Sequence, residues 1–139
     1  MRDDLYLIDT SVWIDVLPPR RAAASPALTQ RVADLISKNR AAATGMIRLE
    51  LLGGARNDAE YLPLVEALDA LVSLPTEERA WDQASLLSHR LRREGRPVPL
   101  PDLVIATVAM ESGAVLLHRD RHFDIIAAYS SLRVESHLS

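Results

Sequence analysis

Two strongly apolar segments, each ending in a polar stretch that contains an acid, constrain the fold most. Tyr6 to Ile8 is followed at once by Asp9, and Ala114 to Leu117 is followed by His118, Arg119 and Asp120. Short, continuously apolar runs of this kind are typical of strands buried on both faces of a parallel sheet. Ligands bind in the crevice beyond the carboxyl ends of such strands. If these two strands are neighbours, Asp9 and Asp120 are therefore expected to share a binding crevice.

Segments with apolar residues at helical spacing separate these strands from weaker ones. Further strands are expected at Arg40–Thr44, Leu71–Leu74 and near Leu132–Val134, and a loop is expected at Pro18 to Arg21. Alternating strands and helices predict an α/β fold, in which helices cover both faces of a parallel sheet. A chain of 139 residues is long enough for one such domain, so residues 1–139 are interpreted as a single domain.

Hydroxyl residues mark the expected starts of helices. Thr10 and Ser11 both suit the N-cap of a helix after the first strand, and Thr76 suits that of a later, long helix. Asp9 can also be read as nothing more than a helix cap. Asp102 follows a stiff, proline-rich lead-in and is expected in the first turn of a mostly apolar helix, where its charge would favour the helix dipole.

Composition excludes several classes of protein. Cysteine is absent, which rules out disulfides, thiolate zinc sites and cysteine nucleophiles. Lys38 is the only lysine and has no glycine-rich loop beside it, which argues against P-loop NTPases and Schiff-base enzymes. The net charge of -3 argues against a globally basic nucleic-acid binder. With no long uncharged apolar run and no secretory signal at the N-terminus, a cytoplasmic protein is expected.

Four acids stand apart because apolar or rigid surroundings hold them: Asp9, Asp102, Asp120 and Glu50, which leucines flank. Two carboxylates about 4 Å apart repel by about 4 kcal/mol at an effective dielectric of 20. A cluster of such acids either takes up protons or binds a cation, and oxygen ligands suit Mg²⁺ or Mn²⁺ better than zinc. Such an ion activates water and binds a phosphodiester oxygen, so the cluster favours metal-assisted hydrolysis.

Other interpretations of these residues remain open. Glu50 can instead pair with an arginine such as Arg48 or Arg56. His118 and His122 flank Asp120, but a transition-metal site built from both is not expected because a turn separates them. The arginines that precede Asp102 suit RNA phosphates and a helix C-terminus equally well; they are Arg90, Arg92, Arg93 and Arg96.

Two other functional classes share part of this pattern. A phosphatase of the haloacid dehalogenase type also places an acid after its first strand, but it needs a second aspartate where this chain has Ser11, and a suitable lysine. A non-catalytic protein-binding module is the second alternative. Acids at all of the four positions argue against a degenerate site.

The segments around these acids resemble the motifs of PIN-domain ribonucleases, specifically VapC-type toxins. The motifs are D-T-S-V-W-I at Asp9, R-L-E-L-L-G at Glu50, P-D-L-V-I-A-T at Asp102 and L-L-H-R-D-R-H-F at Asp120. They occur in order along the whole chain. His118 departs from the pattern, because the family usually has a small hydroxyl residue there.

The resemblance implies a PIN-like three-layer fold with a parallel sheet in the order 3-2-1-4-5. It also implies endoribonuclease activity dependent on Mg²⁺ or Mn²⁺, an RNA substrate, a homodimer and an inhibitory VapB-type antitoxin. Asp9 and Asp102 are predicted to contact the metal, Asp120 to contact it directly or through water, and Glu50 to hold a metal-bound water or act as its base. Thr10 and Ser11 are predicted to support the site, either as helix caps or by hydrogen bonding to a carboxylate or a substrate phosphate. Arg119, which flanks Asp120, is predicted to support it through contact with substrate or antitoxin.

Overall fold

A five-stranded parallel sheet forms the centre of the protein in the computed structural model, which describes residues 3–17 and 25–138. Its strand order, β3-β2-β1-β4-β5, is the order that the resemblance implied. The pairing of Ile8 with Leu117 places the two most apolar strands side by side at its middle. The strands are β1 (Tyr6–Ile8), β2 (Ala41–Thr44), β3 (Val72–Leu74), β4 (Val115–His118) and β5 (Val134–Ser136).

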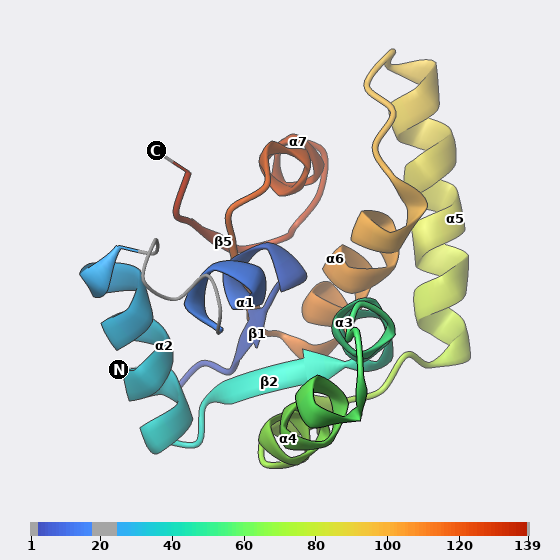
Figure 1. Ribbon diagram of the computed structural model, residues 1–139. Helices are drawn as coiled ribbons and strands as arrows, with labels where there is room; N and C mark the ends of the chain where they lie inside the picture. Colours follow the sequence, from blue (N-terminus) through green and yellow to red (C-terminus); the bar gives the residue numbers. More distant parts are fainter. Residues whose placement is uncertain (1–2, 18–24, 139) are drawn as a thin grey trace.

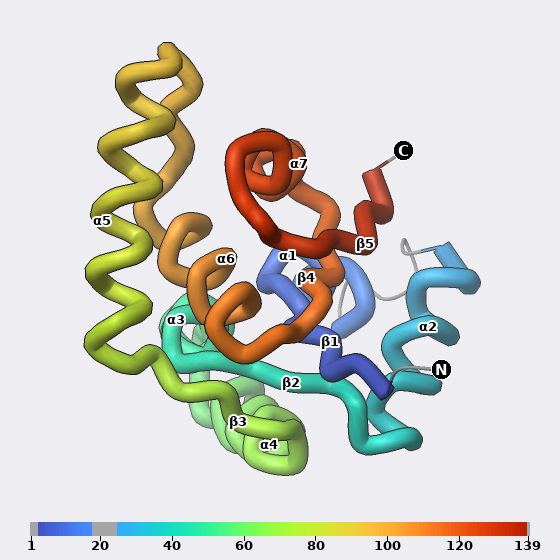
Figure 2. Tube along the Cα trace, turned by 180° about the vertical axis from the view of Figure 1, so that it is seen from behind, coloured from blue at the N-terminus to red at the C-terminus, as the bar shows by residue number. Residues whose placement is uncertain are grey.

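Helices cover both faces of the sheet and make a three-layer α/β fold. Helix α2 lies on one face, whereas α3 and α6 lie on the other, and α5 packs along the outside of α6 (Figures 1 and 2). The loop expected at Pro18 to Arg21 lies outside the described residues. The helices are α1 (Thr10–Val16), α2 (Pro26–Ser37), α3 (Gly45–Gly53), α4 (Asp58–Asp69), α5 (Glu78–Arg93), α6 (Leu100–Ser112) and α7 (Arg121–Ala128).

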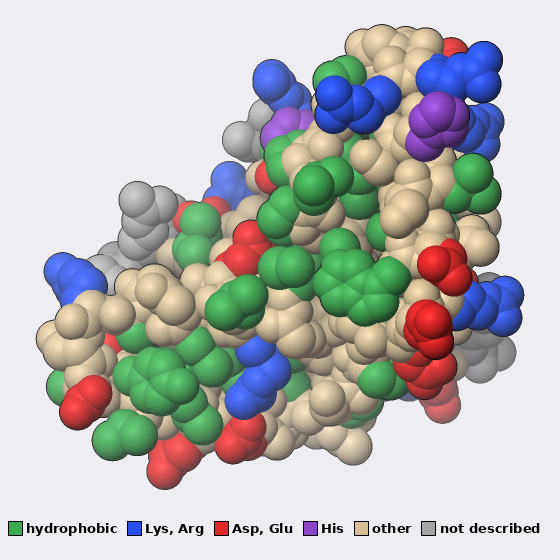
Figure 3. Space-filling model, turned by 90° about the vertical axis from the view of Figure 1, so that its right-hand side faces the viewer, with side chains coloured by type: hydrophobic (Ala, Val, Ile, Leu, Met, Phe, Trp, Pro, Cys, Tyr) green, Lys and Arg blue, Asp and Glu red, His purple; other side chains and the backbone are tan. Residues whose placement is uncertain are grey.

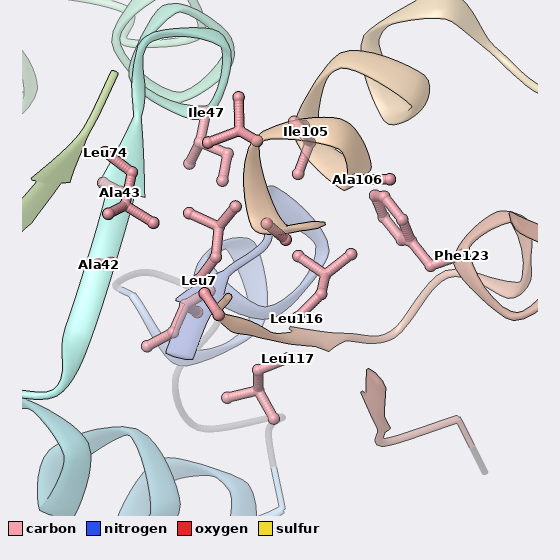
Figure 4. Close-up of a cluster of buried hydrophobic side chains, with 14 of the residues drawn as sticks. Leu7, Ala42, Ala43, Ile47, Leu74, Ile105, Ala106, Leu116, Leu117 and Phe123 are labelled. Carbon is pink, nitrogen blue, oxygen red and sulfur yellow. The ribbon is translucent and has the colours of Figure 1, made fainter. Parts of the chain in front are cut away.

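The hydrophobic core explains why the central strands and α6 are apolar nearly all round. Leu7, Leu116 and Ile105 are completely buried and meet between the sheet and α6, while Leu117 points to the opposite face (Figure 4). Phe123 from α7 is also completely buried and packs into the same core. A strand and a helix that are buried on all sides carry no polar face, so β1, β4 and α6 are rigid supports for whatever follows them.

Two expected helix caps were wrong. The N-cap of α1 is Asp9 rather than Thr10 or Ser11, since the Asp9 carboxylate accepts the Ser11 N–H. The N-cap of α5 is Glu77 rather than Thr76, whose hydroxyl instead lies 3.3 Å from that of Thr44. Aspartate, serine and threonine all suit an N-cap. Which of them caps a helix depends on the residue at which the chain leaves the sheet.

Within the described ranges, no helix is both long and apolar enough to cross a membrane.

Candidate metal centre

Asp9 is the most deeply buried of the candidate acids. It follows β1 directly, and its backbone N–H donates to the carbonyl of Leu117 at 2.9 Å, so β4 fixes its position. Its side chain is 4% exposed and accepts hydrogen bonds from the Ser11 N–H at 2.9 Å and the Ser11 hydroxyl at 2.6 Å. Burial raises the pKa of Asp9, although the hydrogen bonds from Ser11 oppose that rise. Asp9 is thus both a helix cap and a carboxylate held in a poorly solvated position.

Ser11 links the two central strands to the acid. Besides donating to Asp9, its hydroxyl accepts the backbone N–H of Arg119 at 2.9 Å. The guanidinium of Arg119 is taken up by an ion pair with Asp15 and by a hydrogen bond of 3.2 Å to the His137 carbonyl. Arg119 therefore braces the segment after β4 against α1, which favours a supporting role over direct contact with substrate.

Glu50 approaches the acid cluster from α3. Its carboxylate accepts the Thr10 hydroxyl at 2.8 Å. Partial burial raises the pKa of Glu50, and the charge of Asp9 raises it further. The alternative interpretation, in which Glu50 pairs with Arg48 or Arg56, is wrong, because Arg48 binds Asp69 and Arg56 binds Glu60.

The reason given for singling out Glu50 also needs correction. Its flanking leucines do not enclose it, since Leu49 is 65% exposed and Glu50 itself lies at the surface. The buried residues of α3 are Ile47 and Leu51. Leu49 and Glu50, which lie between them in the sequence, are on the solvent-exposed face of the helix.

The ionised form of Asp102 is strongly disfavoured in the acid cluster. It lies in the first turn of α6, as expected, and only 13% of its side chain is exposed. Burial raises the pKa of Asp102 to about 7, and the negative charges of Asp120, Asp9 and Glu50 contribute to that rise. The strand arrangement was expected to bring Asp9, Asp102 and Asp120 together, and the charges of Asp9, Asp120 and also Glu50 do act on Asp102.

Asp120 caps the N-terminus of α7 and brings His122 to the cluster. The Asp120 carboxylate accepts the backbone N–H of His122 at 2.9 Å, which folds the ring back over it. Nδ1 of His122 lies 2.9 Å from Asp120 Oδ1 and 3.2 Å from Asp102 Oδ2. Sequence reasoning missed His122, because it considered this residue only as a partner of His118.

His118 is not part of the group of possible metal ligands found among the described residues. Its ring is completely buried, and Nδ1 accepts the backbone N–H of Asp120 at 3.0 Å. Nε2 therefore carries the ring proton and donates to Asp124 at 3.1 Å. The imidazole ties the backbone of Asp120 to α7 at the position where a small hydroxyl residue is usual in VapC-type sequences.

The cluster fits a divalent cation. Asp102, Asp120 and His122 each offer one ligand atom, and these atoms all lie within 4.8 Å of one another. Adjacent ligands of an octahedral ion at about 2.1 Å are about 3 Å apart, similar to the separations around His122 Nδ1. That nitrogen is buried and has no partner with hydrogen-bond geometry among the described residues. A cation would satisfy it and relieve the repulsion among the acids.

Basic side chains lie beyond this cluster. Arg96 and Arg121 line a hollow of about 560 Å³ together with Asp124 and Tyr129. Arg90, in contrast, donates to the Tyr129 carbonyl at 3.1 Å and holds α5 against the end of α7. Of the arginines that precede Asp102, Arg90 therefore has a structural role, whereas Arg96 lines a surface hollow.

The arrangement does not suit a phosphatase of the haloacid dehalogenase type. Lys38 caps the C-terminus of α2 just before β2 begins, so it lies at the amino ends of the strands. Asp9 lies at their carboxyl ends, and the position two residues later holds Ser11, whose hydroxyl is bound to Asp9. Neither the lysine nor the second aspartate of that chemistry is in place.

Comparison with known proteins agrees with this geometry. The model of the PIN domain family matches residues 6–129. The ribonuclease VapC11 of Mycobacterium tuberculosis is 34% identical over 136 residues, which cover 95% of this chain and 98% of that protein.

Two solved structures share the fold. VapBC-5 from Mycobacterium tuberculosis, a member of a family of toxin–antitoxin systems, superposes with a TM-score of 0.65 at 25% identity over 98% of this chain and 99% of that one. VapBC2 from Rickettsia felis, bound to a DNA fragment from its promoter, gives a TM-score of 0.77 at 18% identity, covering 95% and 98%. From the family match and the relative of nearly equal length, the chain belongs to the PIN domain family, within its VapC group.

Proposed function

We propose that this protein is the endoribonuclease toxin of a VapBC-type toxin–antitoxin module, and that it hydrolyses RNA phosphodiesters with the help of Mg²⁺ or Mn²⁺. The observation that carries the proposal is the convergence of Asp9, Glu50, Asp102 and Asp120 at the carboxyl ends of β1 and β4, where burial and the charges of the other three acids raise the pKa of Asp102. Relatives named as VapC ribonucleases support the choice of RNA as substrate. We take residues 1–139 as a single PIN domain that acts in the cytoplasm.

Each acid has a role that follows from its surroundings. Asp9, Asp102 and Asp120 would hold the ion, because rigid strand ends and helix starts aim them at one place. The bound ion would supply an activated water and neutralise charge on the phosphate. Glu50 lies farther out on α3, and burial together with the charge of Asp9 raises its pKa, which makes its carboxylate a stronger base toward the attacking water. Thr10 and Ser11 orient Glu50 and Asp9.

A cleavage assay with purified protein tests the proposal. The parent should cut RNA only with added Mg²⁺ or Mn²⁺, and EDTA should stop the reaction. Asp9→Asn and Asp102→Asn should each lower the rate by at least about 100-fold, since replacing even an outer-sphere partner of a metal ligand commonly costs 10–100-fold. Asp82→Asn, an exposed acid on α5, is the matched control and should cleave like the parent. Metal-dependent cleavage that survives both substitutions would overturn the assignment.

A VapB-type antitoxin would bind the apolar groove beside the acid cluster. Ile14, Leu17, Leu51 and Leu64 line a hollow of about 540 Å³ between α1, α3 and α4, and Glu50 stands at its border. A partner chain in this groove would therefore approach the acids and could present a basic residue to them. Ile14→Asn should weaken binding of the antitoxin by at least about 10-fold without slowing RNA cleavage. Unchanged inhibition of Ile14→Asn would place the antitoxin elsewhere.

A homodimer would cover a second apolar face. Leu49, Trp81 and Leu100 are between 50% and 65% exposed on α3, α5 and α6, and hydrophobic side chains gather on the side of the molecule that carries α5 (Figure 3). Exposed apolar patches often mark protein–protein contacts, and a second copy of the chain would bury this one. Sedimentation should show a dimer for the parent and a monomer for Trp81→Glu. A monomeric parent would contradict this part of the proposal.

A further inference from the structure

His122 occupies a position in the acid cluster that hydrogen bonding within the protein does not explain. Nδ1 is 2.9 Å from Asp120 Oδ1 and 3.2 Å from Asp102 Oδ2, yet neither oxygen lies in the direction required for a hydrogen bond from the ring. The nitrogen is also closed off from water. A buried polar atom without a hydrogen-bond partner among the described residues calls for an explanation, and one explanation is a ligand that the polypeptide itself does not supply.

The geometry around this nitrogen suits coordination. His122 Nδ1 lies about as far from Asp120 Oδ1 and from Asp102 Oδ2 as neighbouring ligand atoms around a small cation do, and one ligand atom from each of the three residues falls within 4.8 Å of the others. The backbone N–H of His122 binds the same Asp120 oxygen that approaches the ring, so the first turn of α7 fixes carboxylate and imidazole together. Such outer hydrogen bonds are how proteins orient metal ligands.

We propose that His122 is a nitrogen ligand of the catalytic ion, beside Asp102 and Asp120, and that it biases the site toward Mn²⁺ over Mg²⁺. The inference rests on the proposed function, because it concerns the same metal centre. Imidazole binds first-row transition metals in preference to Mg²⁺, whereas a site made of oxygen ligands alone favours the hard Mg²⁺ ion. The nitrogen thus distinguishes this chain's centre from one built from carboxylates only.

Calorimetry measures the selectivity. Titrating the parent, His122→Ala and His122→Asp with MnCl₂ and with MgCl₂ gives a ratio of the two affinities for each protein. Both substitutions should lower the preference for Mn²⁺ by at least about 10-fold. His122→Asp is the more informative variant, because it restores a ligand and should bind Mg²⁺ at least as tightly as His122→Ala does. His89→Ala, an exposed histidine on α5, should match the parent.

Pulsed EPR on the Mn²⁺-loaded proteins detects the ligand directly. The parent and His89→Ala should show coupling of the ion to an imidazole nitrogen, and His122→Ala should lose it. Binding of Mn²⁺ with no nitrogen coupling, or with an unchanged affinity ratio in both His122 variants, would overturn the inference and leave the nuclease assignment intact. Binding of Mn²⁺ by Asp102→Asn as tightly as by the parent would instead overturn the metal centre itself, and the inference with it.

Discussion

Replacing Asp102 with asparagine should stabilise the metal-free protein at alkaline pH. The pKa of Asp102 is raised from 3.8 to about 7 by burial and by the neighbouring acids. Between these values the folded protein keeps a proton that the unfolded chain has already released. The stabilising contribution of Asp102 is therefore complete below about pH 4 and is lost as the pH rises to about 7. Asparagine resembles the protonated acid at every pH. The Asp102→Asn variant should therefore keep this stabilising contribution as the pH rises.

The size of this effect on the folding free energy follows from the shift in the pKa of Asp102. A pKa moved from 3.8 to about 7 corresponds to about 4 kcal/mol of folding free energy. Side chains of Asp120 and His122 leave the cluster partly open to water, so solvent screening reduces this to about 2 kcal/mol. For a protein of 139 residues, a difference of this size raises Tm by about 6–10 °C.

Urea unfolding in EDTA from pH 4.5 to 8.5 measures this effect. Asp102→Asn should match the parent most closely at the acidic end and exceed its free energy of unfolding by about 2 kcal/mol at pH 8. Adding Mn²⁺ should reverse the order, because an ion at 100 times its Kd adds about 2.7 kcal/mol to the parent and much less to a variant that lacks a ligand. A difference between the proteins that does not vary with pH, or an equal gain from Mn²⁺, would refute the reasoning.

Three further substitutions test other parts of the account. Ser11→Ala removes the hydroxyl that donates to Asp9 and should weaken Mn²⁺ binding by about 10–100-fold in calorimetry; an unchanged Kd would show that Ser11 does not orient the acid. Gly113→Ala forces a side chain into a left-handed turn at φ 67° and should cost about 1–2 kcal/mol in urea unfolding, whereas Gly45→Ala, at an open helix start, should cost nothing. Arg121→Ala should lower the slope of log affinity for RNA against log salt by about 1 if its guanidinium binds a phosphate, and an unaltered slope would exclude this.

The strands and the acids that follow them could be predicted from sequence because their signals are local. Continuous apolar runs identify β1 and β4, and acids at their ends identify the crevice edge. That Asp9 and Asp120 share a crevice depends on β1 and β4 being neighbours, which the pairing of Ile8 with Leu117 establishes. The order of the outer strands came from the resemblance rather than from the pattern.

Features that depend on tertiary packing could not be predicted from local sequence patterns. Glu50 was selected for its flanking leucines, but α3 turns Leu49 to the surface, and it is the approach of Thr10 that links Glu50 to the cluster. His122 could not be found by its spacing from Asp120 alone, because its partner Asp102 comes from a different helix. The one local signal was an imidazole two residues after a capping acid, which folds back over that acid.

Diffraction from crystals grown with Mn²⁺ tests the central claim most directly, because anomalous scattering locates the ion independently of the surrounding protein. The account predicts a strong anomalous peak within bonding distance of Asp9, Asp102 and Asp120. Crystals that bind Mn²⁺ only at other sites, with no peak between these acids, would contradict it.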